Sequence, residues 1–116
     1  LQKVDRLNDP NLVKVAVDRS CRALYFSRSV IPYPGKDPRK TTPPGHSYFK
    51  HVGIYGYRSD VLEEIAGLPP SPLEIMESLE QLRWLEHGFR IQTRITRYTS
   101  LGVDTPEDLE RIRGHF

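Results

Sequence analysis

The sequence contains very little cysteine and no long apolar run. Cys21 is its only cysteine, so the chain cannot form an internal disulfide, which fits a reducing compartment. No apolar run approaches the roughly 20 residues of a membrane-spanning helix, and no signal-like N-terminus is seen. We therefore expect a cytoplasmic protein without a membrane segment.

Short motifs of cofactor chemistry are missing as well. The chain has no CxxC pair, no GxGxxG fingerprint and no P-loop. Its 116 residues are enough for one domain, and ten prolines among them predict much irregular chain. The chain begins at Leu1 rather than at an initiator methionine, so we expect it to be a piece of a longer protein.

Charge is unevenly spread along the chain. Residues 1–58 carry 11 basic and 4 acidic side chains, whereas residues 59–116 carry 6 basic and 11 acidic ones. A basic half indicates anionic ligands or nucleic acid, and an acidic half indicates a pairing surface or a metal site. Nucleic acid is the less favoured partner, because the basic residues are scattered rather than concentrated on one helix.

Two short alternating segments predict an antiparallel hairpin. Residues 12–17 place three valines on one face, and residues 23–27 form a second strand after a short turn. Arg28 follows directly. An arginine at a strand end suits bidentate capture of a carboxylate or phosphate, and a solvated surface arginine is the alternative.

A third strand is predicted over residues 48–57, after a proline-rich loop at residues 32–47 that is typical of a lid or binding loop. A two-residue period puts His51, Gly53 and Tyr55 on one face. Glycine in a strand often marks the close approach of a ligand. This face therefore indicates a pocket, and an ordinary core strand is the alternative.

The second half of the chain predicts three helices and one strand. A short helix covers residues 61–66, and a longer one runs from Pro72 to about His87 behind the N-cap Ser71. On its helical wheel Glu80 falls inside an apolar arc with Gln81 beside it. A buried carboxylate needs a ligand or a partner, so Glu80 is either a binding residue or one half of a salt bridge.

Asp104 is the candidate metal ligand. It follows a predicted strand at residues 89–98 and precedes a predicted helix that begins around Thr105 and ends near Arg113. A magnesium ion bound to a nucleotide needs only one or two protein carboxylates. The alternative is an ordinary loop aspartate. Taken together, the elements predict an α/β protein with too few strands for a doubly wound sheet of its own.

Seven segments of the chain, in order, resemble one family. They are Asn11–Val15, Ala23–Arg28, Ile31–Pro32, Lys50–Tyr57, Pro70–Glu74, Leu79–Arg83 and Gly102–Glu110. Together they look like the C-terminal half of the 3-deoxy-manno-octulosonate (Kdo) cytidylyltransferases, also called CMP-Kdo synthetases. The resemblance implies the C-terminal part of a nucleotide-diphospho-sugar-transferase-like, Rossmann-like fold with a mixed sheet.

The resemblance also implies an activity. Such enzymes transfer CMP from CTP to Kdo, release pyrophosphate, use Mg²⁺, serve lipopolysaccharide synthesis and form homodimers. By the same resemblance, Arg28 and His51 hold the sugar acid's carboxylate or hydroxyls, and Asp104 binds magnesium. Tyr55, Glu80 and Gln81 line the sugar pocket.

The family's glycine-rich CTP loop matches nothing in these residues. We therefore expect residues 1–116 to be the sugar-binding and dimerisation half, inactive without the CTP-binding half. Two alternatives stay open: a cytidylyltransferase for another sugar acid, or a non-catalytic dimerisation or interaction module.

Overall fold

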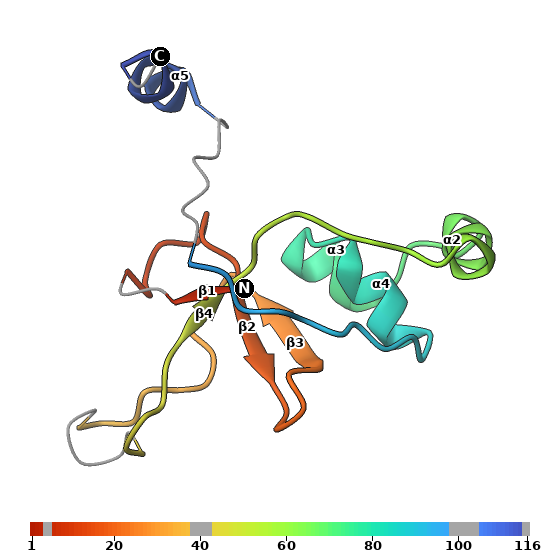
Figure 1. Cartoon of the computed structure of the whole chain (residues 1–116), viewed down its shortest axis with the longest axis horizontal. Helices are drawn as coiled ribbons and strands as arrows, with labels where there is room; N and C mark the ends of the chain where they lie inside the picture. Colours follow the sequence, from red (N-terminus) through yellow and green to blue (C-terminus); the bar gives the residue numbers. More distant parts are fainter. Residues whose placement is uncertain (4–5, 38–42, 98–104, 115–116) are drawn as a thin grey trace.

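A small antiparallel sheet forms the centre of the protein in the computed structural model (Figure 1). The structure describes residues 1–3, 6–37, 43–97 and 105–114. The strands are β1 (Gln2–Lys3), β2 (Lys14–Val17), β3 (Ala23–Ser27) and β4 (Phe49–Lys50), in the sheet order β1-β4-β2-β3. The helices are α2 (Ser59–Ala66), α3 (Pro72–Glu77), α4 (Gln81–Glu86) and α5 (Pro106–Arg113). The α/β class is confirmed, and all the described strand pairs are antiparallel.

The predicted hairpin is confirmed as the β2–β3 pair. Val15 lies opposite Phe26 in its register. The turn contains no glycine, and Cys21 supplies the left-handed residue, with φ 60°. The Asp18 carboxylate accepts the backbone N–H groups of Ser20 (2.8 Å) and Arg22 (2.9 Å). Local hydrogen bonds of this kind allow a non-glycine residue to occupy a left-handed turn position.

The predicted strands at residues 48–57 and 89–98 are longer than the observed ones. Only Phe49 and Lys50 enter the sheet, and residues 51–58 form no regular strand. The later segment makes an isolated bridge between Arg22 and Gln92, and Tyr98 lies outside the described residues. Alternating residues favour an extended backbone, but a strand also needs a neighbour to receive its hydrogen bonds. The described part of the chain supplies that neighbour over only a few residues.

The predicted helix over residues 72–87 is wrong, because the chain breaks at Ser78. Ser78 takes the left-handed conformation (φ 55°, ψ 46°) and separates α3 from α4. Consequently Ile75 and Met76, which belong to the apolar arc of the predicted continuous helix, are 69% and 81% exposed. Leu79 and Leu82 are buried in the core with Val15 and Phe26.

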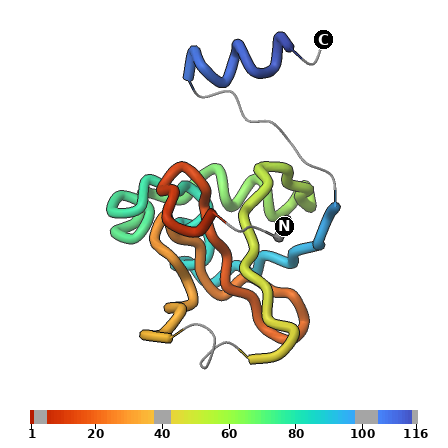
Figure 2. The backbone as a smooth tube through the Cα atoms, turned by 90° about the vertical axis from the view of Figure 1, so that its left-hand side faces the viewer, coloured from red at the N-terminus to blue at the C-terminus, as the bar shows by residue number. Residues whose placement is uncertain are grey.

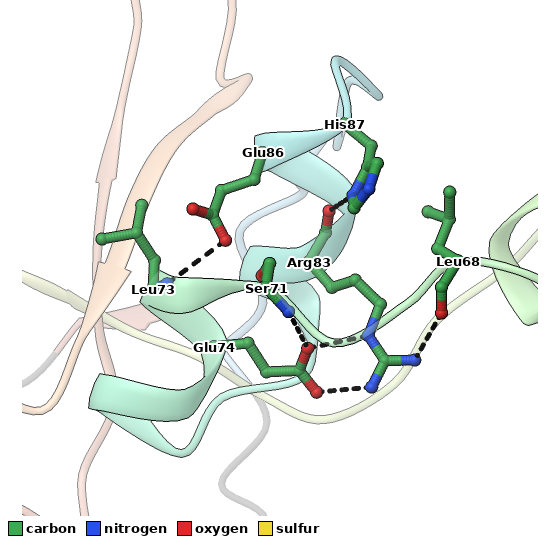
Figure 3. Close-up of polar contacts among 7 residues, drawn as sticks. All are labelled: Leu68, Ser71, Leu73, Glu74, Arg83, Glu86 and His87. Carbon is green, nitrogen blue, oxygen red and sulfur yellow. Dashed lines mark hydrogen bonds and ion pairs between the residues drawn. The ribbon is translucent and has the colours of Figure 1, made fainter.

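A half-buried ion pair holds α3 against α4 (Figure 3). Arg83 donates through Nε and Nη2 to the two carboxylate oxygens of Glu74, at 2.7 and 2.6 Å. Glu74 also accepts the backbone N–H of Ser71 at the start of α3 (3.1 Å), and Arg83 Nη1 donates to the Leu68 carbonyl. The hydrogen bonds from Arg83 lower the pKa of the Glu74 carboxyl, against the effect of burial. One residue pair therefore joins both helices and the connector before them.

The last helix, α5, stands apart from the sheet and the other helices in both views (Figures 1 and 2). Its N-terminus has the predicted capping box, in which Thr105 and Asp108 each accept the other's backbone N–H at 3.2 Å. No helix in the described residues is long and apolar enough to cross a membrane.

Candidate functional site

His51 and Tyr55 form a hydrogen-bonded pair next to the core. The Tyr55 hydroxyl lies 2.6 Å from His51 Nε2. Burial lowers the pKa of His51 and raises the pKa of Tyr55. The imidazole is therefore neutral at neutral pH, and the phenol keeps its proton. When the Tyr55 O–H donates to Nε2, the proton of the neutral His51 lies on Nδ1, where it can serve as a donor toward a ligand.

Aromatic rings enclose this pair. The Tyr55 and Tyr57 rings are stacked, with centroids 6.0 Å apart. Both meet the Trp84 ring edge-on, at 5.2 and 5.7 Å. Phe26 makes a similar edge contact with His51, at 5.4 Å. His51, Tyr55 and Tyr57 thus lie together as the two-residue period predicts, although the segment that carries them is not a regular strand.

Two clefts meet at this aromatic group. The larger, of about 670 Å³, is lined by His51, Tyr55, Tyr57 and Trp84 together with residues of the 89–96 segment. The smaller, of about 330 Å³, is lined by Tyr55, Tyr57, Leu62, Ile65, Ala66, Glu80, Gln81, Arg83 and Trp84. Four of the predicted site residues, His51, Tyr55, Glu80 and Gln81, therefore surround one aromatic centre.

Glu80 and Gln81 reach the smaller cleft in a different way from the one predicted. The helical wheel placed Glu80 inside an apolar arc, but Glu80 is exposed at the N-cap of α4, because the Ser78 break reorients everything after it. Gln81 is only 6% exposed and Trp84 only 7%. Gln81 Nε2 and Trp84 Nε1 are buried donors without a hydrogen-bond partner among the described residues. Such donors are costly unless an acceptor is supplied.

Arg28 lines neither cleft. Its guanidinium donates to three backbone carbonyls, those of Glu77 (2.8 Å), Pro10 (3.0 Å) and Ser78 (3.3 Å). Its backbone N–H donates to the Glu77 carboxylate at 2.8 Å. The structure thus places Arg28 at the helix break and not beside His51 and Tyr55.

Comparison with known proteins decides the family. The cytidylyltransferase family model matches residues 1–95. The chain belongs to the cytidylyltransferase family. It is 49% identical over 111 residues to the 3-deoxy-manno-octulosonate cytidylyltransferase of Phocaeicola vulgatus, which covers 96% of this chain and 43% of that protein. The enzyme of the same name from Syntrophotalea carbinolica is 53% identical over 111 residues, or 93% of this chain and 44% of that one.

The fold of the chain is also similar to that of a solved structure from the same family. This cytidylyltransferase chain is similar to a CMP:2-keto-3-deoxy-manno-octonic acid synthetase complexed with CTP, with a TM-score of 0.86 and 45% identity. The match covers 98% of this chain and 46% of that one. The chain thus spans less than half the length of the relatives that it matches, and the family predicted from the seven segments is confirmed.

The magnesium role of Asp104 stays a prediction. Asp104 lies outside the described residues of this cytidylyltransferase chain. Within residues 1–3, 6–37, 43–97 and 105–114, no three His, Cys, Asp or Glu side chains gather closely enough to hold a metal ion. A nucleotide-bound magnesium ion needs fewer protein ligands than that, so this finding is compatible with a single aspartate.

Sequence reasoning missed Trp84 and the contribution of α2 to the site of this cytidylyltransferase chain. Trp84 lines both clefts, and Leu62, Ile65 and Ala66 of α2 close the smaller one. Tyr57 could have been included, because it shares the alternating face of His51 and Tyr55. No local signal marks Trp84, since an aromatic residue in an amphipathic helix is most simply a core residue.

The pair formed by His51 and Tyr55 predicts a pH dependence of stability. Burial lowers the folded-state pKa of His51 below its ordinary value of 6.5. As the pH falls through 6.5, the unfolded chain takes up a proton that the folded chain resists, so the free energy of unfolding should fall between pH 7 and pH 5. Urea unfolding at several pH values measures this slope.

His51→Gln should flatten the slope, because glutamine does not titrate and still accepts a hydrogen bond from Tyr55. His87→Gln is the matched control. His87 lies exposed at the end of α4, so its replacement should leave the contribution of His51 to the slope intact. An equal slope in the His51→Gln variant and the unsubstituted chain would contradict the buried neutral imidazole.

Proposed function

We propose that the chain is the sugar-acid-binding and dimerisation portion of a cytidylyltransferase that transfers CMP from CTP to Kdo and releases pyrophosphate. The observation that carries the proposal is the pair of clefts that meet at Tyr55: His51 lines the larger one, and Glu80 and Gln81 line the smaller one, in each case beside aromatic rings. Sugar-binding pockets combine such rings with a few well-placed polar groups. The choice of Kdo as substrate rests on the names of the related proteins. Because those relatives are more than twice as long as this chain, we assign the complete activity to a larger protein.

The polar atoms of the cleft suit a polyhydroxylated acid. His51 Nδ1–H is a donor for a carboxylate or hydroxyl oxygen, and the Glu80 carboxylate is an acceptor for sugar hydroxyls. The Gln81 amide and the Trp84 indole are donors that lack an acceptor among the described residues. Binding a sugar acid here would fix the orientation of its anomeric hydroxyl for attack on the α-phosphate of CTP, which is a task of positioning.

Magnesium belongs to the proposal through Asp104. When bound with CTP, the ion would supply positive charge to the triphosphate as the bond to pyrophosphate breaks. Asp104, which directly precedes the N-cap of α5 in the sequence, is the residue that would hold it. The chain by itself is expected not to turn over CTP, and CMP-Kdo formation by the purified 116 residues would contradict that expectation.

Calorimetric titration of the chain with Kdo tests the proposed function. Kdo should bind, and His51→Ala should weaken binding at least about tenfold, which corresponds to about 1.4 kcal/mol, because a buried ligand would lose its donor. His87→Ala removes an exposed histidine outside both clefts and should leave the affinity unchanged.

The same titration separates the alternatives. Tighter binding of a sialic acid than of Kdo would assign the chain to another sugar acid. Binding of neither sugar acid, or equal binding by the His51→Ala variant, would overturn the proposed site.

We also propose that the protein forms a homodimer and functions in the cytoplasm. Leu24 of β3 and Ile75 and Met76 of α3 are exposed apolar side chains on the hairpin and the neighbouring helix. They supply apolar surface of the kind that subunit contacts bury. Light scattering at high protein concentration that finds only a monomer would count against it.

A further inference from the structure

Arg28, which directly follows β3, forms hydrogen bonds to the backbone at the break between α3 and α4. The guanidinium of Arg28 donates to the carbonyls of Glu77 and Ser78, the two residues at which the helix stops. The Glu77 carboxylate in turn accepts the Ser27 hydroxyl (3.0 Å) and the Arg28 backbone N–H (2.8 Å). The end of β3 and the helix break are therefore joined by four hydrogen bonds.

Local sequence alone does not favour this break. Ser78 is neither glycine nor asparagine, and a left-handed conformation is unfavourable for it. The residues around it favour one continuous helix from Ser71 to Gly88. Contacts made elsewhere in the fold must therefore stabilise the left-handed serine.

The ion pair between Glu74 and Arg83 also depends on the break. Residues nine positions apart on a continuous helix lie on opposite faces and about 13 Å apart along its axis. The distance of 2.6 Å between Arg83 Nη2 and Glu74 Oε1 is possible only because the chain reverses direction between α3 and α4 at Ser78.

The break determines where the candidate binding residues lie. Immediately after Ser78, Leu79 enters the core, Glu80 becomes the N-cap of α4 and Gln81 reaches the wall of the smaller cleft. In a continuous helix each of these side chains would point in a different direction. The cleft that contains Tyr55, Glu80 and Gln81 exists because the helix is interrupted.

We infer that Arg28 serves the sugar acid as a positioning residue: it holds the Glu77 and Ser78 carbonyls and so presents Glu80 and Gln81 to the cleft. Among the described residues, all three hydrogen bonds of its guanidinium are with backbone carbonyls, and Arg28 lines neither cleft. The inference rests on the proposed function for the identity of the ligand.

A pair of ligands distinguishes positioning from direct ionic contact. Kdo and its uncharged carboxamide are titrated into the chain and into the Arg28→Gln and Arg28→Lys variants. Arg28 holds the Glu77 and Ser78 carbonyls through two different nitrogens of its guanidinium, an arrangement that neither glutamine nor lysine reproduces. Both variants should therefore lose about tenfold in affinity, and the loss should be the same for Kdo and for its carboxamide. If Arg28 contacted the carboxylate, the loss would vanish with the carboxamide and Arg28→Lys would retain much of the Kdo affinity. That result would overturn the inference.

Ser78 provides a second, independent test. Ser78→Gly favours the left-handed conformation, so it should restore most of the affinity lost in Arg28→Gln. Ser78→Val keeps Arg28 but makes the left-handed conformation more costly, because a β-branched side chain is strained at positive φ, so it should weaken the binding of both ligands equally. Failure of Ser78→Gly to rescue Arg28→Gln would overturn the inference.

NMR of the ligand-free chain separates this inference from the proposed function. In Arg28→Gln the ¹³C shifts of residues 78–80 should move from left-handed toward helical values, and in the double variant with Ser78→Gly they should move back. If the unsubstituted chain binds no Kdo, the proposed function fails and so does any role of Arg28 toward a sugar acid. Unchanged shifts in Arg28→Gln would show that Arg28 does not hold the break.

Discussion

Lys14→Met is expected to destabilise the protein by about 3 kcal/mol or more, since hydrogen bonds from a charged donor contribute about 1.5–3 kcal/mol each. Lys14 lies in β2 with an exposed fraction of 0%. Its ammonium donates to the carbonyls of Asp9 (2.8 Å), Leu12 (2.7 Å) and Arg28 (2.6 Å). Methionine matches the length of lysine but leaves all three carbonyls without their donor.

Urea unfolding followed by fluorescence measures this effect, because Trp84 is the only tryptophan of the chain. Lys36→Met is the matched control: Lys36 is exposed, and a substitution of that kind usually changes stability by no more than about 0.5 kcal/mol. Equal unfolding midpoints for the two variants would contradict a structural role of the buried ammonium. Burial lowers the pKa of Lys14, while the nearby carboxylates of Asp9 and Glu77 oppose that shift.

Phe26→Ala is expected to cost about 3–5 kcal/mol, the usual range for a buried phenylalanine. Phe26 is 1% exposed, packs in the core with Val15 and Leu82, and meets the edge of the His51 ring. Its removal would leave a cavity under the imidazole, so the loss of stability should be accompanied by weaker Kdo binding at temperatures where the variant stays folded.

Leu24→Ala is the control on the same strand. Leu24 is 61% exposed, so its truncation removes little buried apolar area. The free energy of unfolding should therefore fall by less than about 1 kcal/mol. The comparison is made in dilute solution, where self-association does not bury Leu24. A cost for Phe26→Ala no larger than that for Leu24→Ala would contradict the core around β2 and β3.

The two predictions concern residues that connect the core to the candidate site. Lys14 ties the loop before β2 to the carbonyl of Arg28, and Arg28 ties that loop and the end of β3 to the helix break. Phe26 connects the core to His51. Although the smaller cleft is lined by residues between positions 55 and 84, its geometry depends on a hairpin that precedes those residues by several dozen positions.

Patterns among residues close together in the sequence were sufficient to predict part of this structure. The alternating valines of β2 and the run of β3 predicted strands that the structure confirms, and the caps at Ser71 and Thr105 predicted helix starts that it confirms. The two-residue period brought His51 and Tyr55 together, and they are hydrogen-bonded. In each case the determining interaction lies within a few residues along the chain.

The helix break, the exposure of Glu80 and the place of Arg28 depended on the tertiary structure. The residues around Ser78 favour a helix, and contacts from β3, some 50 positions earlier, override that preference. Trp84 became part of the site only when α2 and the segment after β4 packed around it. The sequence by itself thus determined the family, the hairpin, the helix starts and the His51–Tyr55 face, because those are set by local periodicity, caps and motifs. Only the tertiary structure decided how the chain turns at Ser78 and which side chains share the cleft, because the favourable free energy of long-range contacts outweighs local helix preference there.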